Sequence, residues 1–175
     1  NELRERMREE LDYSLEARNV EEFARLFAGH PWVRVPQLIP ELSTARLLTT
    51  EWVDGLSFDE FRRTASQATK QRAGEVIWRF AQHAVLRHGA FNGDPHPGNY
   101  KFHHDGSVTF LDYGLVKRWS PGEWESLQPT LDAIVVHRDP ERVVAAMETS
   151  GFLRSGHGLK TDLIYDYVSS PYRPY

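Results

Sequence analysis

Three polar residues at a fixed spacing constrain the fold of this chain more than any other feature of its sequence. Asp94 and Asn99 lie five residues apart in FNGDPHPGNY, residues 91–100, which also holds two prolines and two glycines. Asp112 follows thirteen residues after Asn99, at the end of the apolar run in FLDYGLV. Prolines stiffen a loop and glycines permit unusual backbone angles, so we expect this loop to hold one defined shape.

The residues between Asn99 and Asp112 predict a β-hairpin. NYKFHHDGSVTFLDY reads as two strands joined by a turn at His104-Asp105-Gly106. A hairpin returns the chain to its starting point, so it would bring Asp112 beside the loop that holds Asp94 and Asn99. We expect the oxygen atoms of these three side chains to converge.

Two interpretations account for this convergence. Asp and Asn supply the oxygen ligands that Mg²⁺ prefers, and phosphoryl transfer needs such ligands together with a group that positions the acceptor. In protein kinases an aspartate precedes a metal-binding asparagine by five residues and a D-F-G follows, as Asp94, Asn99 and DYG do here. The alternative is a pair of ordinary turns that collect Asp and Asn. The combined pattern favours the phosphate site.

Apolar periodicity and capping signals predict an α+β fold with a mostly helical second half. The helices are expected over residues 2–28 (continuous or bent near Asn19), 57–63 and 68–88, and after the cap pairs Ser120-Pro121 and Asp139-Pro140. Strands are expected over residues 32–40 and 45–55. Trp78 is expected in the core, and His96 is expected to hold the shape of its loop.

Three sequence blocks together resemble the AarF/UbiB family of atypical protein-kinase-like enzymes. They are GDPHPGN with LDYG, EELDYSLEARN, and VPQLIPELSTARLLTTEWVDG, and the resemblance covers residues 10–116. It implies a protein-kinase-like fold, of which the chain forms the helical carboxy-terminal lobe together with the αC-like helix and the hinge strands. We therefore expect residues 1–175 to be one partial domain, with the helix and hinge in 1–55 and the lobe in 56–175.

The resemblance also implies a role for Asp94, Asn99 and Asp112. Asp94 would be the catalytic-loop aspartate. Asn99 and Asp112 would bind Mg²⁺, with Asp112 in the position of the D-F-G aspartate.

The resemblance implies nucleotide-binding roles for a second group of residues. Glu16 would pair with a lysine on an upstream strand. Glu10 and Asp12 would form the E-x-D motif that faces the nucleotide. Glu51 and Val53 would lie at the adenine-binding hinge, where backbone groups make the contacts.

Several departures from the family pattern accompany the resemblance. The chain has no Gly- or Ala-rich nucleotide loop, no V-A-I-K lysine and no K-x-G-Q segment. All three would precede residue 1, and the chain begins with Asn1 rather than Met, so we expect a piece of a longer protein. Tyr113 replaces the usual phenylalanine, and Asn92 stands where the family often has histidine.

Composition narrows the classes of partner. The net charge is −4 and there is no long Lys/Arg block, so the sequence lacks the basic charge pattern of a nucleic-acid-binding protein. No apolar run has the length of a membrane helix. The resemblance implies ATP as a partner, with an isoprenoid quinone or another lipid as a further candidate. It also implies a place on the cytoplasmic side, peripheral to a membrane through the full-length protein.

The expected function is Mg²⁺-dependent ATP binding with phosphoryl transfer or ATP hydrolysis, in support of ubiquinone-type lipid biosynthesis. One alternative is a small-molecule phosphotransferase of the aminoglycoside or choline type, whose loop has a similar GD-x-H-x-x-N pattern. The other is a non-catalytic module that uses nucleotide binding to switch its grip on a lipid or a protein.

Overall fold

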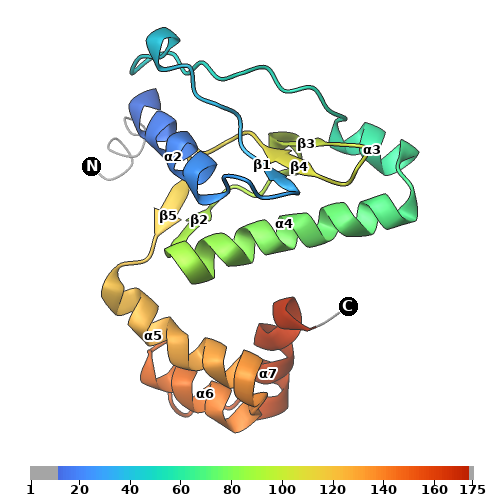
Figure 1. Ribbon diagram of the computed structural model, residues 1–175. Helices are drawn as coiled ribbons and strands as arrows, with labels where there is room; N and C mark the ends of the chain where they lie inside the picture. The colour runs from blue at the N-terminus through green and yellow to red at the C-terminus, as the bar shows by residue number, and fades with distance from the viewer. Residues whose placement is uncertain (1–11, 174–175) are drawn as a thin grey trace. The chain divides into compact units, whose positions relative to one another are not determined.

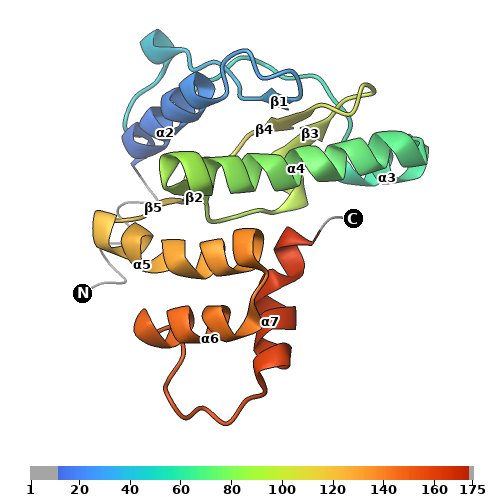
Figure 2. The same ribbon diagram turned by 60° about the horizontal axis from the view of Figure 1, so that its bottom comes forward.

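The computed structural model describes residues 12–173 of the chain. The chain divides into two compact units, the first ending at Arg118 and the second beginning at Trp119. Figures 1 and 2 show the helices and strands of both units. The expected organisation of residues 1–175 as one partial domain stays a prediction.

The first unit mixes helices with very short strands. Its described elements, in chain order, are α2 (Tyr13–Leu26), β1 (Val33–Arg34), a 3₁₀ turn (Pro40–Leu42), α3 (Phe58–Thr64), α4 (Gln67–His88), β2 (Ala90–Asn92), a second 3₁₀ turn (Pro97–Asn99), β3 (Tyr100–Phe102), β4 (Val108–Phe110) and β5 (Val116–Arg118). Local signals explain the helix limits. Ser57 and Glu60 form a capping box at the start of α3, and Gly89 ends α4 in a left-handed conformation with φ of 60°.

Two small sheets organise the strands. In the first, β4 lies between β1 and β3, parallel to β1 and antiparallel to β3, with Val33 opposite Val108 and Tyr100 opposite Phe110. The second pairs β2 with β5 in antiparallel orientation, with Phe91 opposite Lys117. The β3–β4 pair confirms the predicted hairpin. The β2–β5 pair brings the strand before the loop against the strand that follows Asp112.

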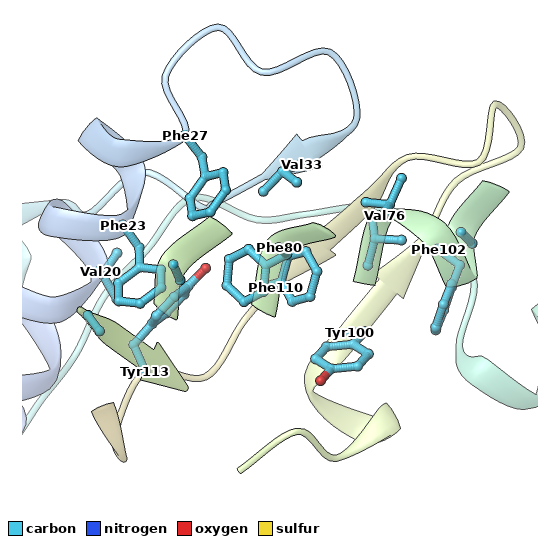
Figure 3. Close-up of a cluster of buried hydrophobic side chains, with 14 of the residues drawn as sticks. Val20, Phe23, Phe27, Val33, Val76, Phe80, Tyr100, Phe102, Phe110 and Tyr113 are labelled. Atoms are coloured by element: carbon cyan, nitrogen blue, oxygen red, sulfur yellow. The ribbon is translucent and has the colours of Figure 1, made fainter. Parts of the chain in front are cut away.

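An aromatic core joins α2, α4 and β4. The ring of Phe80 on α4 stacks on Phe110 of β4 with centroids 3.7 Å apart. Phe23 of α2 lies 5.7 Å from Phe80 and 5.0 Å from Tyr113, measured between ring centroids (Figure 3). Truncating a buried phenylalanine of this kind typically costs ~3–5 kcal/mol. The core therefore fixes α2 and the residues after β4, including Tyr113, in one arrangement.

Four expectations about this unit need correction. The helix expected over residues 2–28 begins at Tyr13, because Asp12 is extended (φ −105°, ψ 92°) and caps it; residues 2–11 lie outside the described residues. α2 continues through Asn19 as one helix. The strand expected over 32–40 is reduced to β1, and the strand expected over 45–55 is reduced to isolated bridges such as Leu38–Thr50. Trp78 is 37% exposed, because it lies two positions from the buried Val76 and Phe80 and so on another face of α4.

The second unit is helical in its described residues. It contains α5 (Pro121–Asp132), a π-helical turn (Ala133–His137), α6 (Pro140–Thr149), α7 (Thr161–Ser169) and a 3₁₀ turn (Ser170–Tyr172). Figure 2 shows α5 and α6 packed side by side, and α7 packs against α6 and the π-helical turn. Ser120 and Asp139 cap α5 and α6 as predicted. Over residues 12–173, no helix is both long and apolar enough to cross a membrane.

Candidate catalytic and metal-binding site

The loop that follows β2 is held in shape by its own backbone and by His96. The Gly93 N–H donates to the Leu115 carbonyl oxygen at 2.7 Å, which ties the start of the loop to the segment after Asp112. The Nδ1 atom of His96 accepts from the Gly98 N–H at 3.0 Å, as expected for a histidine that supports the loop. A Cβ atom on Gly98 would lie 2.9 Å from that nitrogen, so only glycine fits there without a shift.

Asp94 and Asn99 meet across this loop. The Nδ2 group of Asn99 lies 3.3 Å from Oδ2 of Asp94 and 3.5 Å from its carbonyl oxygen. The 3₁₀ turn over Pro97–Asn99 closes the five-residue spacing, and its proline pre-sets the backbone. Because the amide nitrogen of Asn99 points at Asp94, its amide oxygen is left available for another ligand.

Asp112 lies at the turn just after β4. Its Oδ1 atom accepts from the Gly114 N–H at 2.9 Å. A Cβ atom on Gly114 would lie 3.3 Å from Oδ1 of Asp112 and 3.5 Å from Oε2 of Glu16, so glycine leaves room for both carboxylates. One carboxylate oxygen of Asp112 thus bonds to the backbone, and the other carboxylate oxygen remains for a ligand.

Asn92 connects the loop to this turn. Its Nδ2 group donates to the carbonyl oxygen of Asp112 at 2.6 Å, and its Oδ1 atom accepts from the Asp94 N–H at 2.9 Å. The two expected site segments therefore meet through one side chain. In the sequence, Asn92 stood out only as a departure from the family pattern. In the structure, its side chain makes a hydrogen bond to each of the two segments.

Glu16 reaches the same turn from α2. Its Oε1 atom accepts a long hydrogen bond from the Tyr113 N–H at 3.4 Å. Burial raises the pKa of Glu16, and the nearby charge of Asp112 raises it further, while the bond from Tyr113 opposes both effects. In a similar way, burial together with the charge of Asp94 raises the pKa of Tyr100.

The other expected nucleotide-site residues make local contacts. Asp12 caps α2 by accepting from the Ser14 N–H at 2.9 Å, and its hydrogen bonds with Ser14 lower its pKa. Glu51 exchanges two hydrogen bonds with Gln37, one from its N–H and one to its carboxylate. Val53 is partly buried. Glu10 lies outside the described residues. The structure thus gathers Asp94, Asn99, Asp112 and Glu16, whereas Asp12 and Glu51 bond elsewhere.

Asn19 and Arg118 join the site without having been expected there. Asn19 is 1% exposed, donates from Nδ2 to the Tyr113 carbonyl oxygen at 2.8 Å, and accepts from Arg118 at 2.9 Å. Arg118 also pairs with Glu22 of α2. The only signal in the sequence is a polar residue on the apolar face of a helix, which left open a continuous helix or a bend near Asn19.

The donor set suits Mg²⁺ bound together with phosphate oxygens. Within residues 12–173, no cluster of three or more His, Cys, Asp or Glu residues could hold a metal. Mg²⁺ is usually bound by one or two carboxylates plus substrate phosphates, not by an all-protein cage. The carboxylate of Asp112 and the amide oxygen of Asn99 match that chemistry.

Comparisons with known proteins agree with this geometry. The model of the ABC1 atypical kinase-like domain matches residues 1–147. The chain is 36% identical over 162 residues to the chloroplastic protein ACTIVITY OF BC1 COMPLEX KINASE 1 of Arabidopsis thaliana, which covers 87% of this chain and 22% of that protein. It is 32% identical over 163 residues to the uncharacterized protein sll0005 of Synechocystis, covering 91% of this chain and 24% of that one.

A solved structure shares the fold. The complex of Rv3197 with erythromycin from Mycobacterium tuberculosis matches with a TM-score of 0.74 and 28% identity, over 97% of this chain and 44% of that one. The chain therefore spans about a quarter of the length of the curated relatives and under half of the solved chain. The expected α+β, protein-kinase-like fold is confirmed. This chain belongs to the family of the ABC1 atypical kinase-like domain, the AarF/UbiB family.

Proposed function

We propose that this chain carries the catalytic loop and the metal ligands of an Mg²⁺-dependent ATP site that performs phosphoryl transfer or ATP hydrolysis. One observation carries the proposal: the amide of Asn99 turns its nitrogen to Asp94 and keeps its oxygen for a ligand. Membership in a kinase-like family supports the proposal.

Asp112 and Asn99 are the proposed Mg²⁺ ligands, one through a carboxylate oxygen and the other through its amide oxygen. Mg²⁺ bound there would neutralise negative charge on the nucleotide phosphates. Asp94 is the proposed catalytic residue, which would accept or orient the proton of the acceptor hydroxyl or of water. The bond from Asn99 holds the Asp94 carboxylate in one orientation, so the same asparagine would serve both the metal and the catalytic aspartate.

A second set of residues is proposed to bind the nucleotide. Glu16 would pair with a lysine from an upstream strand, and Glu10 and Asp12 would face the nucleotide. The adenine would lie at the segment of Glu51 and Val53. Because the Glu51 N–H already donates to Gln37, the backbone of Val53 is the better candidate for contacts with the base.

The biological setting rests on the family alone. We propose that the activity supports isoprenoid-quinone biosynthesis at a membrane surface in the full-length protein. The solved relative binds erythromycin, and that property is its own. The acceptor of the phosphoryl group, if not water, would then be a lipid or a partner protein.

Separate measurements of binding and turnover test the catalytic assignment in the full-length protein. Asp94→Ala should leave Mg-ATP affinity within about twofold and lower turnover by about 10²–10⁴-fold. Asp59→Ala is the matched control, because the Asp59 carboxylate is exposed and pairs with Arg62 on α3. Equal turnover in Asp94→Ala and wild type would remove Asp94 from catalysis. Nucleotide binding without turnover in the wild type would favour the non-catalytic switch module.

A further inference from the structure

We propose that Asn19 is a positioning residue for Asp112, acting through the peptide between Tyr113 and Gly114, and that Arg118 sets the orientation of Asn19. The functional part of this inference rests on the proposed role of Asp112 as a metal ligand. The physical part concerns only contacts among described residues of the first unit.

Two successive peptide groups after Asp112 are held at both of their polar ends. In the peptide between Asp112 and Tyr113, the carbonyl oxygen accepts from Asn92 and the N–H donates to Glu16. In the peptide between Tyr113 and Gly114, the carbonyl oxygen accepts from Asn19 at 2.8 Å and the N–H donates to Oδ1 of Asp112 at 2.9 Å. The backbone angles on both sides of Tyr113 are therefore fixed.

The link from Asn19 to the Asp112 carboxylate is a rigid one. A trans peptide is planar, with its carbonyl oxygen and its N–H at opposite edges. When Asn19 fixes the carbonyl end of the Tyr113–Gly114 peptide, it also fixes the direction of the Gly114 N–H. That N–H holds Oδ1 of Asp112, so a rotation of this peptide would turn the carboxylate away.

Arg118 decides which way the Asn19 amide faces. A guanidinium has donors only, so the group that faces Arg118 must be the amide oxygen. The Nδ2 group of Asn19 is then directed to the Tyr113 carbonyl. Arg118 is held in turn by Glu22, which lies on α2 three residues beyond Asn19. Asn19 is almost fully buried, so water does not compete for these bonds.

Asn19→Asp separates the two bonds of this side chain. Aspartate keeps the acceptor for Arg118 but loses the donor for the Tyr113 carbonyl and places a negative charge against it. Arg118→Lys is a second variant at a partly exposed position: it keeps the charge beside Glu22 but loses the planar fork that orients the amide. Glu21→Gln is the matched control, because it removes one negative charge from an exposed position on α2 and leaves the contacts of Asn19, Arg118 and Glu22 in place.

The test measures the Mg²⁺ dependence of ATP binding in the full-length protein, together with amide hydrogen exchange at Tyr113 and Gly114. Asn19→Asp should raise the Mg²⁺ concentration for half-maximal ATP binding by about tenfold or more, the size expected when a ligand loses its fixed geometry. Arg118→Lys should give a smaller increase, and Glu21→Gln should match the wild type. Exchange at Gly114 should accelerate in the same order.

Two results would overturn the inference. One is an Asn19→Asp protein that is less stable to heat yet keeps the wild-type Mg²⁺ midpoint, because Asn19 would then be only structural. The other is unchanged exchange at Tyr113 and Gly114. A wild-type protein without Mg²⁺-dependent ATP binding would refute the proposed function instead. The hydrogen-exchange data would still show whether Asn19 holds the Tyr113–Gly114 peptide. Exchange accelerates in Asn19→Asp if Asn19 holds that peptide, and it stays unchanged if Asn19 does not.

Discussion

The side chain of Asn92 donates a hydrogen bond to the carbonyl oxygen of Asp112 at 2.6 Å and so joins the loop to the turn after β4. The same amide accepts from the Asp94 N–H. Asparagine offers a donor and an acceptor from one planar group, so this single residue can bond both segments. This side chain adds to the backbone bond from the Gly93 N–H to the Leu115 carbonyl oxygen, which also joins the two proposed site segments.

Asn92→Ala should therefore weaken both the fold and the site. The change removes both bonds and leaves the partly buried Asp112 carbonyl without its donor, which typically costs ~1–3 kcal/mol of unfolding free energy. Denaturant unfolding measures that loss, and calorimetry should show weaker Mg-ATP binding. Asn92→His, which can keep one bond, should lose less. A stability of Asn92→Ala within about 0.5 kcal/mol of wild type would show that the bridge is dispensable.

Glu16 should make the stability of this chain depend on pH. Burial and the charge of Asp112 raise its pKa above the ordinary value of 4.5. A carboxyl whose pKa rises on folding stabilises the folded state below its unfolded pKa, and that contribution is lost as the pH rises through the folded pKa. Denaturant unfolding above pH 4.5 should thus show wild type losing stability relative to Glu16→Gln. Parallel pH curves for the two proteins would contradict this.

The proposed lysine partner predicts the opposite slope in the full-length protein. A cation beside Glu16 would lower the pKa of that carboxyl, so its contribution would appear above the unfolded pKa and be lost as the pH falls. The sign of the slope in the full-length protein therefore tests the pairing.

Tyr113→Phe should stabilise the protein. Tyr113 is fully buried, and no described residue offers a hydrogen-bond partner to its hydroxyl, which Figure 3 shows directed into the aromatic cluster. An unpaired buried hydroxyl costs about 1–3 kcal/mol, and phenylalanine removes that group while keeping the ring. We expect a higher unfolding temperature, with Tyr167→Phe at an exposed position as the unchanged control. A less stable Tyr113→Phe would mean that the hydroxyl has a stabilising role.

Local signals were enough to predict much of the fold. The caps at Ser57, Ser120 and Asp139 and the stop at Gly89 act within a few residues, so the sequence specifies them directly. The hairpin between Asn99 and Asp112 was predictable for the same reason, since its turn residues lie between its two strands. The sequence was therefore enough to predict that this hairpin brings Asp112 next to the loop of Asp94 and Asn99.

Long-range contacts could not be predicted from the sequence in this way. Arg118 and Asn19 are 99 residues apart, and no local pattern pairs them. Residues 45–55 have the composition of a strand, but they form only isolated bridges, because strand propensity does not supply a partner. At Asp12, the same side chain that suits a helix surface instead caps the backbone, so α2 begins at Tyr13.

Calorimetric titration of ATP into the full-length protein, with and without Mg²⁺, tests the central claim most directly. Wild type and the Asp59→Ala control should bind ATP in a Mg²⁺-dependent manner, and Asp112→Ala should lose that dependence because a carboxylate ligand is gone. Mg²⁺-dependent binding that survives unchanged in a folded Asp112→Ala protein would contradict the account. The metal would then lie elsewhere, and the Asp94, Asn99 and Asp112 arrangement would be a pair of turns.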